Sequence, residues 1–238
     1  VDFSASLPPK VLFRFLEYCG GILKHKGVAR WIIKTPPNVY NPAQAALLQT
    51  FLINHGFQVS NAEVSVLLLA DEVPFLSKTA PWERRRFNQA QRHGLVCRIV
   101  APDALQDVYT FIEQCRAERS YRLSISFENL KKTVQTFPDH FILFTVWDGA
   151  VLAAASVVIK INEAVLYNFL SAHKKSYDNL SPVVLLFSEV YSYCVSNGFK
   201  LLDLGTSAFQ GKPNFPLLDF KLRLGSIPGS KLTFQKLL

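Results

Sequence analysis

No hydrophobic run in this sequence is long enough to cross a membrane. The longest runs, residues 64–70 and 151–159, fall far short of the roughly 20 apolar residues that a membrane-spanning helix needs. The first ten residues also lack the basic segment followed by an apolar core that marks a secretory signal. We therefore expect a cytoplasmic protein with no transmembrane segment.

Cysteine is scarce and scattered. Cys19, Cys97, Cys115 and Cys194 form no CxxC pair, and no histidine cluster lies near any of them. This spacing argues against a zinc site and against a disulfide scaffold. We interpret all four as small hydrophobic residues and expect no metal.

Glycine is missing from two places where a phosphate-binding turn would need it. None occurs between Gly149 and Gly198, and residues 35–42 contain three prolines and no glycine. A helix that holds a pyrophosphate offers it closely approaching backbone N–H groups, which glycine permits and proline lacks. We therefore do not expect the usual type of coenzyme A site in either place.

Basic residues outnumber acidic ones. The 26 lysines and arginines exceed the 18 aspartates and glutamates, which gives a net charge of +8 and a pI near 9.4. This balance predicts an anionic partner, and nucleic acid, a nucleotide-linked substrate and an anionic membrane surface all fit it. Basic and aromatic residues are not interleaved as in single-strand binding proteins, so general nucleic-acid binding ranks low.

Composition indicates a globular protein with a substantial core. Hydrophobic residues make up 49% of the 238 residues and charged residues 18%. This length fits one large domain or two domains of about 120 residues each.

The second half of the chain alternates strand and helix patterns in the order β-α-α-β-β-β-α-β-α-β. Asp148-Gly149 lies between two apolar runs, which is a strong hairpin signal. Ser181-Pro182 places proline at the first position of a long helix, and Asn197-Gly198 ends it. We expect strands at 95–100, 141–147, 151–159, 164–171, 200–204 and 231–237, and helices that begin near 103, 127, 182 and 217.

The first half has the pattern of an incomplete unit of the same kind. Strands at 28–34 and 62–69 alternate with helices at 41–54 and 80–93, but the strand and two helices that should precede them are largely missing. We therefore predict an α/β (α+β) fold of two tandem units. Residues 1–94 form the incomplete one and residues 95–238 the complete one, each a mixed, mostly antiparallel sheet flanked by helices.

Polar side chains gather in the last third of the chain. An apolar strand ends at Asp203, and a Gly-Thr-Ser turn follows at residues 205–207. Lys221 and Arg223 then come from the next short helix. Ligands of α/β sheets commonly bind at the carboxyl ends of strands, so this stretch is the leading candidate for a site.

These segments resemble the Fem-type branch of the GNAT acyltransferase superfamily. Asp-Leu-Gly-Thr-Ser at 203–207, Asn214 and Phe-Lys-Leu-Arg-Leu-Gly at 220–225 are similar to that branch's "DfG.S…N…fK..fG" ending. Residues 177–182 resemble the loop before its last long helix, and the basic residues 84–95 resemble its "R..i.kA.k.G" helix. The resemblance implies tandem GNAT-like units. The Fem-type branch includes the peptidoglycan-bridge aminoacyltransferases, which take an aminoacyl group from charged tRNA.

Three residues are candidates for catalysis. The resemblance places Lys221 near the reacting acyl group, where a fixed cation stabilises developing negative charge. Asp203 could position an amine or the lysine, and His173 could serve as a base, because its pKa is ordinarily near neutrality. The alternatives are a surface lysine, an aspartate that caps a turn, and an incidental loop histidine.

A further group of residues is expected to bind substrate. Tyr177 and Asn179 lie in the loop that replaces a phosphate-binding turn, and a local Asx turn is the alternative for Asn179. Ser207, Asn214 and Arg223 belong to the closing motif.

The basic helix offers an anion-binding face. Arg85, Gln89 and Arg92 recur at i, i+4 and i+7, with Arg86 beside them, while Phe87 can pack inward. Such a face suits phosphate oxygens of a tRNA, a nucleotide sugar or a lipid diphosphate. A solvated helix face is the alternative.

Two functions remain. The first is a bacterial FemAB/GNAT-like N-acyltransferase, which moves an acyl or aminoacyl group to an amine of a cell-wall, peptide or polysaccharide precursor. Its donor would be acyl-CoA or aminoacyl-tRNA, so tRNA is a candidate partner. The second is a catalytically inactive double-GNAT module that binds an anionic ligand or a protein partner, suggested by the missing glycine-rich turn. The sequence leaves the oligomeric state open.

Overall fold

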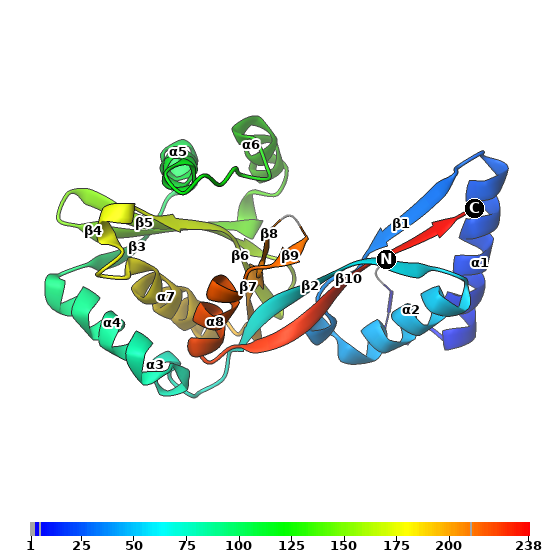
Figure 1. Ribbon diagram of the computed structural model, residues 1–238, viewed down its shortest axis with the longest axis horizontal. Coiled ribbons are helices and arrows are strands. Elements are labelled where there is room, and N and C mark those ends of the chain that lie inside the picture. The colour runs from blue at the N-terminus through cyan, green and yellow to red at the C-terminus, as the bar shows by residue number, and fades with distance from the viewer. Residues whose placement is uncertain (1–2, 5, 210) are drawn as a thin grey trace. The chain divides into compact units, whose positions relative to one another are not determined.

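The computed structural model describes residues 3–4, 6–209 and 211–238, which fold into two compact units (Figure 1). Unit 1 comprises Val1–Ser65, Thr206–Leu218 and Pro228–Leu238. Unit 2 comprises Val66–Gly205 and Asp219–Ile227. In the part of the chain that the structure describes, no helix is long and apolar enough to cross a membrane.

Unit 1 is built on strands from both ends of the chain. β10 lies between β1 and β2 and is antiparallel to β1, with Arg30 opposite Leu237 and Lys34 opposite Thr233. Asn41 caps α2, because its side chain accepts a hydrogen bond from the Gln44 amide at 3.1 Å. The elements are α1 (Pro9–His25), β1 (Arg30–Lys34), α2 (Pro42–Asn54), the first part of β2 (Gln58–Leu69), and β10 (Ile227–Leu237). Their core contains Leu16, Ile33, Leu48, Leu52, Phe57 and Phe234.

The sheet of unit 2 has the strand order β2-β7-β6-β5-β4-β3. β3, β4, β5 and β6 form an antiparallel meander, and Gly149 adopts a φ of +55° in the turn between β4 and β5. β6 and β7 are parallel. The strands are β3 (Val96–Val100), β4 (Phe141–Asp148), β5 (Val151–Lys160), β6 (Val165–His173) and β7 (Leu201–Thr206).

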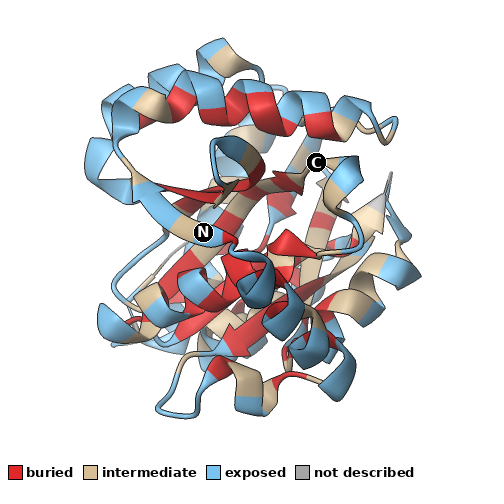
Figure 2. Cartoon of the chain, turned by 90° about the vertical axis from the view of Figure 1, so that its left-hand side faces the viewer, coloured by how far each residue is buried: buried red, intermediate tan, exposed pale blue. Residues whose placement is uncertain are grey.

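Helices cover both faces of this sheet, which gives unit 2 three layers. On one face, α5 (Leu105–Ala117) and α6 (Phe127–Thr136) pack on Leu143, Val157 and Leu170. On the other face, α4 (Pro81–His93) and α7 (Pro182–Ser196) pack on Phe144, Val158 and Leu202. The helix α7 is apolar on nearly every side and is accordingly the most buried helix. Figure 2 shows buried residues in the strands and on the helix sides that face them.

The observed elements confirm most of the predicted ones. Ser126 accepts a hydrogen bond from the Asn129 amide and caps α6, and Pro182 is the first residue of α7. Cys115 and Cys194 are buried free thiols, and burial raises the pKa of Cys194 to about 12. α8 (Phe215–Arg223) is longer than predicted, and β2 begins four residues earlier than expected. The helix α1, the short α3 (Phe75–Lys78) and the two-residue strands β8 (Ala208–Phe209) and β9 (Lys212–Pro213) were not predicted.

The compact units divide differently from the predicted boundary between residues 94 and 95. Residues 66–94 belong to unit 2, and the last strand belongs to unit 1. The reason is that β10 completes its hydrogen bonds with β1, which is about 200 residues away in sequence and has no local signal that reveals this pairing. The division of the chain into two tandem GNAT-like units, residues 1–94 and 95–238, stays a prediction.

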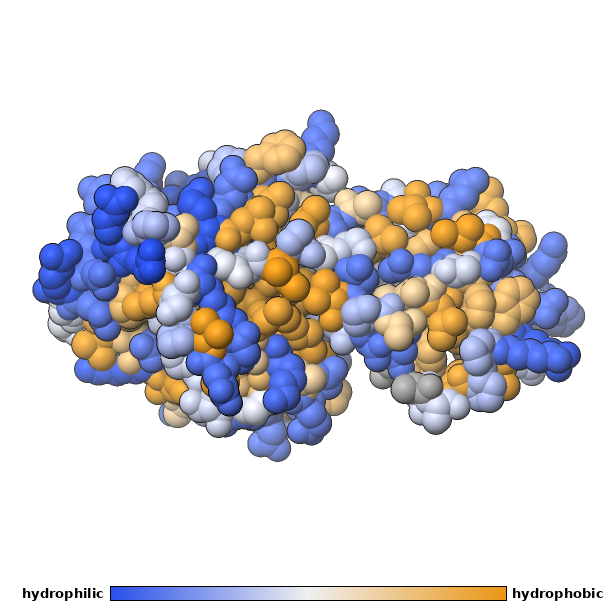
Figure 3. All heavy atoms as spheres, turned by 90° about the horizontal axis from the view of Figure 1, so that it is seen from below, coloured by the Kyte–Doolittle hydropathy of each residue, from blue (hydrophilic) through white to orange (hydrophobic). Residues whose placement is uncertain are grey.

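Some large hydrophobic side chains remain at the surface. Hydrophobic residues are visible between hydrophilic ones on the face shown in Figure 3. On α1, Val11, Phe15, Tyr18 and Ile22 are all exposed and follow one side of the helix. The apolar side of α1 is therefore wider than the part that Leu12 and Leu16 bury.

Gly225 is the position least tolerant of a side chain. Its φ is +85°, and a Cβ there would lie 2.5 Å from the Lys78 carbonyl oxygen. We expect Gly225→Ala to lower the free energy of unfolding by about 3 kcal/mol or more, because backbone strain and steric overlap add. The control is Gly198→Ala, where φ is +78° but no atom lies within 4 Å, and for which we expect a loss of about 1 kcal/mol. Urea unfolding measures both, and equal losses would contradict the steric argument.

Candidate functional site

The parallel strands β6 and β7 part after a short pairing. Val165, Leu166 and Tyr167 lie opposite Leu201, Leu202 and Asp203, and the register ends there. β6 continues to His173 and is paired on its other side with β5, with Phe169 as an extra, bulged residue. Polar side chains of unit 2 lie where the two parallel strands separate, beyond Tyr167 and Asp203.

Lys221 is buried beside the end of β7. Only 5% of the residue is exposed, and its Nζ donates a hydrogen bond to the Gly205 carbonyl oxygen at 2.8 Å. Burial lowers the pKa of Lys221 to about 8, the negative charge of Asp203 opposes this shift, and the positive charge of Arg116 adds to it. A lysine with these properties is a cation near neutral pH that can give up a proton.

Asp203 caps the turn after β7, and its charge acts on Lys221. It is 2% exposed, and its Oδ1 accepts a hydrogen bond from the Gly205 amide at 2.7 Å, which is the turn-capping role. Its carboxylate also lies near enough to Lys221 to favour the charged form of the amine. The structure therefore brings Asp203 and Lys221 together.

A buried polar network lies at the bulge of β6. The Ser156 hydroxyl donates to Asn168 Oδ1 at 2.6 Å, and Asn168 Nδ2 donates to the Ser171 hydroxyl at 3.1 Å. Ser156 and Asn168 are 0% and 6% exposed. The sequence interpretation missed this network, although polar residues inside two otherwise apolar strands were the available signal.

Arg116 also belongs to this region and was not predicted. It comes from the last turn of α5, and its Nη2 donates to the Ser171 carbonyl oxygen at 2.8 Å. Burial lowers the pKa of the guanidinium, which nevertheless stays protonated at neutral pH.

His173 lies in a different cluster. Its Nε2 is 2.8 Å from Asp178 Oδ1 and 3.2 Å from Arg119 Nη2, and Arg119 also pairs with Asp178. Burial lowers the pKa of His173, and the hydrogen bond to Asp178 opposes this, so the imidazole is largely neutral at pH 7. Arg119 and Asp178 are thus the side chains that the structure places against His173.

The other predicted residues occupy varied places. The Tyr177 hydroxyl donates to Asp148 at 2.9 Å, and Asn179 is exposed. Ser207 is buried, and the Asn214 side chain accepts from the Leu217 amide at the start of α8. Arg223 donates to Glu83 Oε1 at 2.9 Å, and Glu83 is fully buried.

The arginines of α4 are held by their own helix. Arg85 and Arg86 lie over the ring of Trp82 at 5.5 and 5.3 Å, and Arg92 Nε donates to the Asn88 carbonyl oxygen at 3.2 Å. Phe87 is buried, as predicted. Arg85 and Arg92 are exposed, so an anion can reach them.

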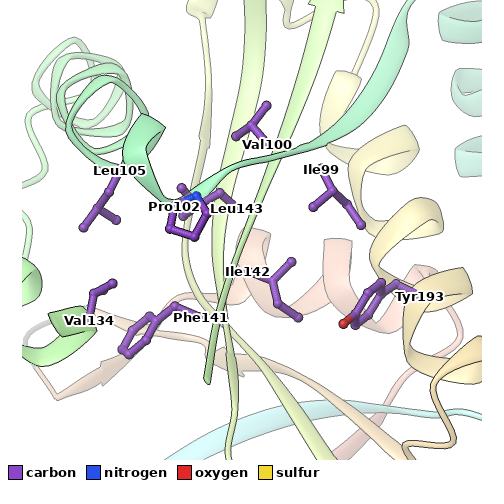
Figure 4. A pocket seen from close by; sticks show the side chains of 9 residues that line it. All are labelled: Ile99, Val100, Pro102, Leu105, Val134, Phe141, Ile142, Leu143 and Tyr193. Atoms are coloured by element: carbon purple, nitrogen blue, oxygen red, sulfur yellow. The ribbon is translucent and has the colours of Figure 1, made fainter. Parts of the chain in front are cut away.

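An apolar pocket of about 240 Å³ lies elsewhere in unit 2 (Figure 4). None of its nine lining residues carries a charge, and none is a predicted site residue. The lining residues are Ile99, Val100, Pro102, Leu105, Val134, Phe141, Ile142, Leu143 and Tyr193. The lining residues include no histidine, carboxylate or lysine, so this pocket offers none of the usual general bases.

Comparison with known proteins identifies the fold of the site. Residues 77–221, more than half of the chain, match the family model described as the acetyltransferase (GNAT) domain. The chain belongs to this GNAT family. The expected Fem-like GNAT fold is thereby confirmed, and acyl transfer is the chemistry of the family. No curated protein matches the chain.

Solved structures support the GNAT assignment. FemX has a TM-score of 0.76 at 11% identity, with 97% of this chain and 77% of that chain covered. The C-terminal domain of a putative lysylphosphatidylglycerol synthetase from Agrobacterium fabrum has a TM-score of 0.66 at 13% identity, covering 95% and 72%. A tandem GNAT protein from the clavulanic acid biosynthesis pathway has 0.54 at 15%, covering 94% and 69%. At these identities the likeness establishes a shared fold.

The lowered pKa of Lys221 predicts a pH dependence of stability. Between about pH 8 and the ordinary value of 10.5, the unfolded chain holds a proton on this amine that the folded protein has released. The free energy of unfolding therefore rises with pH across this window. We expect the stability of the wild type to increase relative to Lys221→Met as the pH rises from neutral to 10.5, measured by urea unfolding. A constant difference between the two proteins would contradict the lowered pKa.

Proposed function

We propose that this GNAT protein is an N-acyltransferase, which moves an acyl or aminoacyl group from an activated donor to an amine. The observation that carries the proposal is the buried Lys221, held on the Gly205 carbonyl oxygen beside Asp203 where β6 and β7 part. A desolvated cation in a fixed position is suited to stabilise an oxyanion, because its field is weakly screened and it needs no reorganisation during the reaction.

The chemistry follows from this placement. The acceptor amine attacks the acyl carbon, a C–N bond forms, and the carbonyl oxygen gains negative charge that Lys221 stabilises. The C–O or C–S bond to the donor then breaks, and the proton lost by the amine leaves with the donor group. A pKa near 8 lets Lys221 stay charged at neutral pH while it remains able to release a proton.

Asp203 is the better supported partner for the amine. Its buried carboxylate and the Lys221 amine both bind Gly205, whereas the partners of His173 are Asp178 and Arg119. We propose that Asp203 keeps Lys221 charged and orients the acceptor, and that His173, Asp178 and Arg119 contact a more distant part of a substrate.

The Fem-type ending of the sequence supports an aminoacyl donor and an acceptor from cell-wall synthesis. The structural similarity to FemX and to a lysylphosphatidylglycerol synthetase domain is consistent with aminoacyl transfer. We therefore propose a peptide, polysaccharide or lipid-linked precursor as the acceptor class. Arg85, Arg86 and Arg92 are proposed to contact its anionic groups or those of a tRNA-linked donor.

Removing the Lys221 amine is expected to abolish transfer. Lys221→Ala and Lys221→Met should lower kcat by at least about 100-fold, as expected for loss of an oxyanion-stabilising group. Lys131→Ala, which removes an exposed lysine on α6, is the matched control and should keep full activity. The measurement is single-turnover transfer with equal amounts of folded protein. Wild-type turnover by both Lys221 variants would contradict the proposed role of Lys221 in stabilising the oxyanion.

A ligand screen is expected to identify the donor. We expect an acyl-coenzyme A, an aminoacyl-adenosine analogue or an aminoacyl-tRNA to raise the unfolding temperature saturably, because a ligand that binds only the folded state stabilises it. Nucleotide sugars and heparin serve as comparison ligands in the same thermal-shift assay. Stabilisation confined to polyanions such as heparin would contradict an enzyme and favour the inactive binding module.

A further inference from the structure

Arg116 is a charged side chain without a counter-ion. Among the described residues, no carboxylate lies within 4.0 Å of its nitrogens, whereas Arg119 pairs with Asp178 and Arg223 with Glu83. Its Nε is buried and has no hydrogen-bond partner in the part of the chain that the structure describes. The one recorded contact of the guanidinium is the bond from Nη2 to the Ser171 carbonyl oxygen.

This arrangement costs free energy in the unliganded protein. A guanidinium cannot escape the cost by losing its proton, because its intrinsic pKa is above about 12. A buried cation is normally paired, and a buried N–H without an acceptor adds a further penalty. The described residues therefore leave this cost uncompensated.

The surroundings of Arg116 add to this deficit of negative charge. The positive charge of Arg119 lowers the pKa of Arg116, and the positive charge of Arg116 lowers the pKa of Lys221. Asp178 is already bound by Arg119 and His173, and Asp203 accepts from the Gly205 amide. Asp178 and Asp203 thus each have another partner, and Arg116 is half-buried, so it stays within reach of a ligand.

We propose that Arg116 binds an anionic oxygen group, a phosphate or a carboxylate, of the substrate. The planar guanidinium matches the oxygens of either group, and the Nε–H is the donor left without a partner. Ser171 orients the side chain through its carbonyl oxygen. The anion would lie along β6 between the Lys221 centre and the His173 cluster. The assignment of this anion to a substrate rests on the proposed function, but its binding does not require turnover.

Anion titrations test the site directly. Sodium phosphate and sodium acetate are titrated into the wild-type protein at constant ionic strength, and the arginine Nε–H resonances are followed by ¹⁵N-resolved NMR. The Arg116 resonance is assigned by its absence from the spectrum of Arg116→Lys. We expect it to shift saturably with at least one anion, and the effective anion distinguishes a phosphate subsite from a carboxylate subsite.

Variants separate a binding role from a structural one. Arg116→Met should weaken anion binding roughly tenfold or more, while its unfolding temperature without anion stays equal to or above that of the wild type, because an uncompensated charge has been removed. Arg14→Met, which removes an exposed arginine on α1, should bind the anion as the wild type does. Arg116→Gln also removes the charge and serves where the methionine variant does not fold.

Three outcomes would overturn the proposal. They are the absence of saturable binding to either anion, unchanged binding in Arg116→Met or in its substitute Arg116→Gln, and a marked loss of stability in Arg116→Met without anion. Anion binding at Arg116 in a protein that transfers no acyl group would leave this site standing and refute the proposed function alone.

Discussion

The organisation of the site depends on the desolvation of one ammonium group. Lys221 needs an acceptor and an opposite charge to remain protonated when buried. Both come from one short turn, because Asp203 Oδ1 binds the Gly205 amide and the Gly205 carbonyl binds Lys221. Gly205 has a φ of +80°, a conformation that residues with a Cβ rarely adopt, so glycine gives the turn its shape. One turn therefore supplies the acceptor, the counter-charge and the end of the parallel pairing.

The helix that carries Lys221 is fixed by contacts away from the site. The Ser226 hydroxyl donates to the Lys221 carbonyl oxygen at 2.5 Å, and the Ala80 amide donates to the Arg223 carbonyl oxygen at 2.7 Å. The fully buried Glu83 holds the Arg223 side chain, and thus the last turn of α8 against the start of α4. We expected Arg223 to bind substrate. In the structure its side chain binds Glu83, so a substrate would have to bind Arg223 while this ion pair is in place. Small shifts at this contact would move the ammonium and so change catalysis without touching the reacting atoms.

Local signals in the sequence predicted most elements, and long-range contacts account for the rest. Asp148-Gly149, Pro182 and the Asn41 cap act within a few residues, so their effect could be recognised directly. The Lys221–Gly205 contact joins residues of one closing motif. The family resemblance predicted a role for Lys221, but it did not predict this contact. By contrast, Arg116 meets Ser171 across 55 residues, and Arg223 meets Glu83 across 140. No periodicity specifies such partners, because they depend on how strands and helices pack after each has formed.

The start of α7 shows why side-chain cations matter in this protein. Ser181 adopts a left-handed conformation, with φ 46° and ψ 55°, where a glycine would be unstrained. Pro182 follows without an N–H, and the Ser181 hydroxyl donates to the Asp178 carbonyl oxygen at 3.3 Å and does not cap the helix. This helix terminus therefore has fewer available donors for a phosphate than a glycine-rich turn would provide. In the proposed reaction an anionic donor would therefore be bound by fixed positive side chains, and Lys221, Arg116 and Arg119 are the cations beside the ends of β6 and β7.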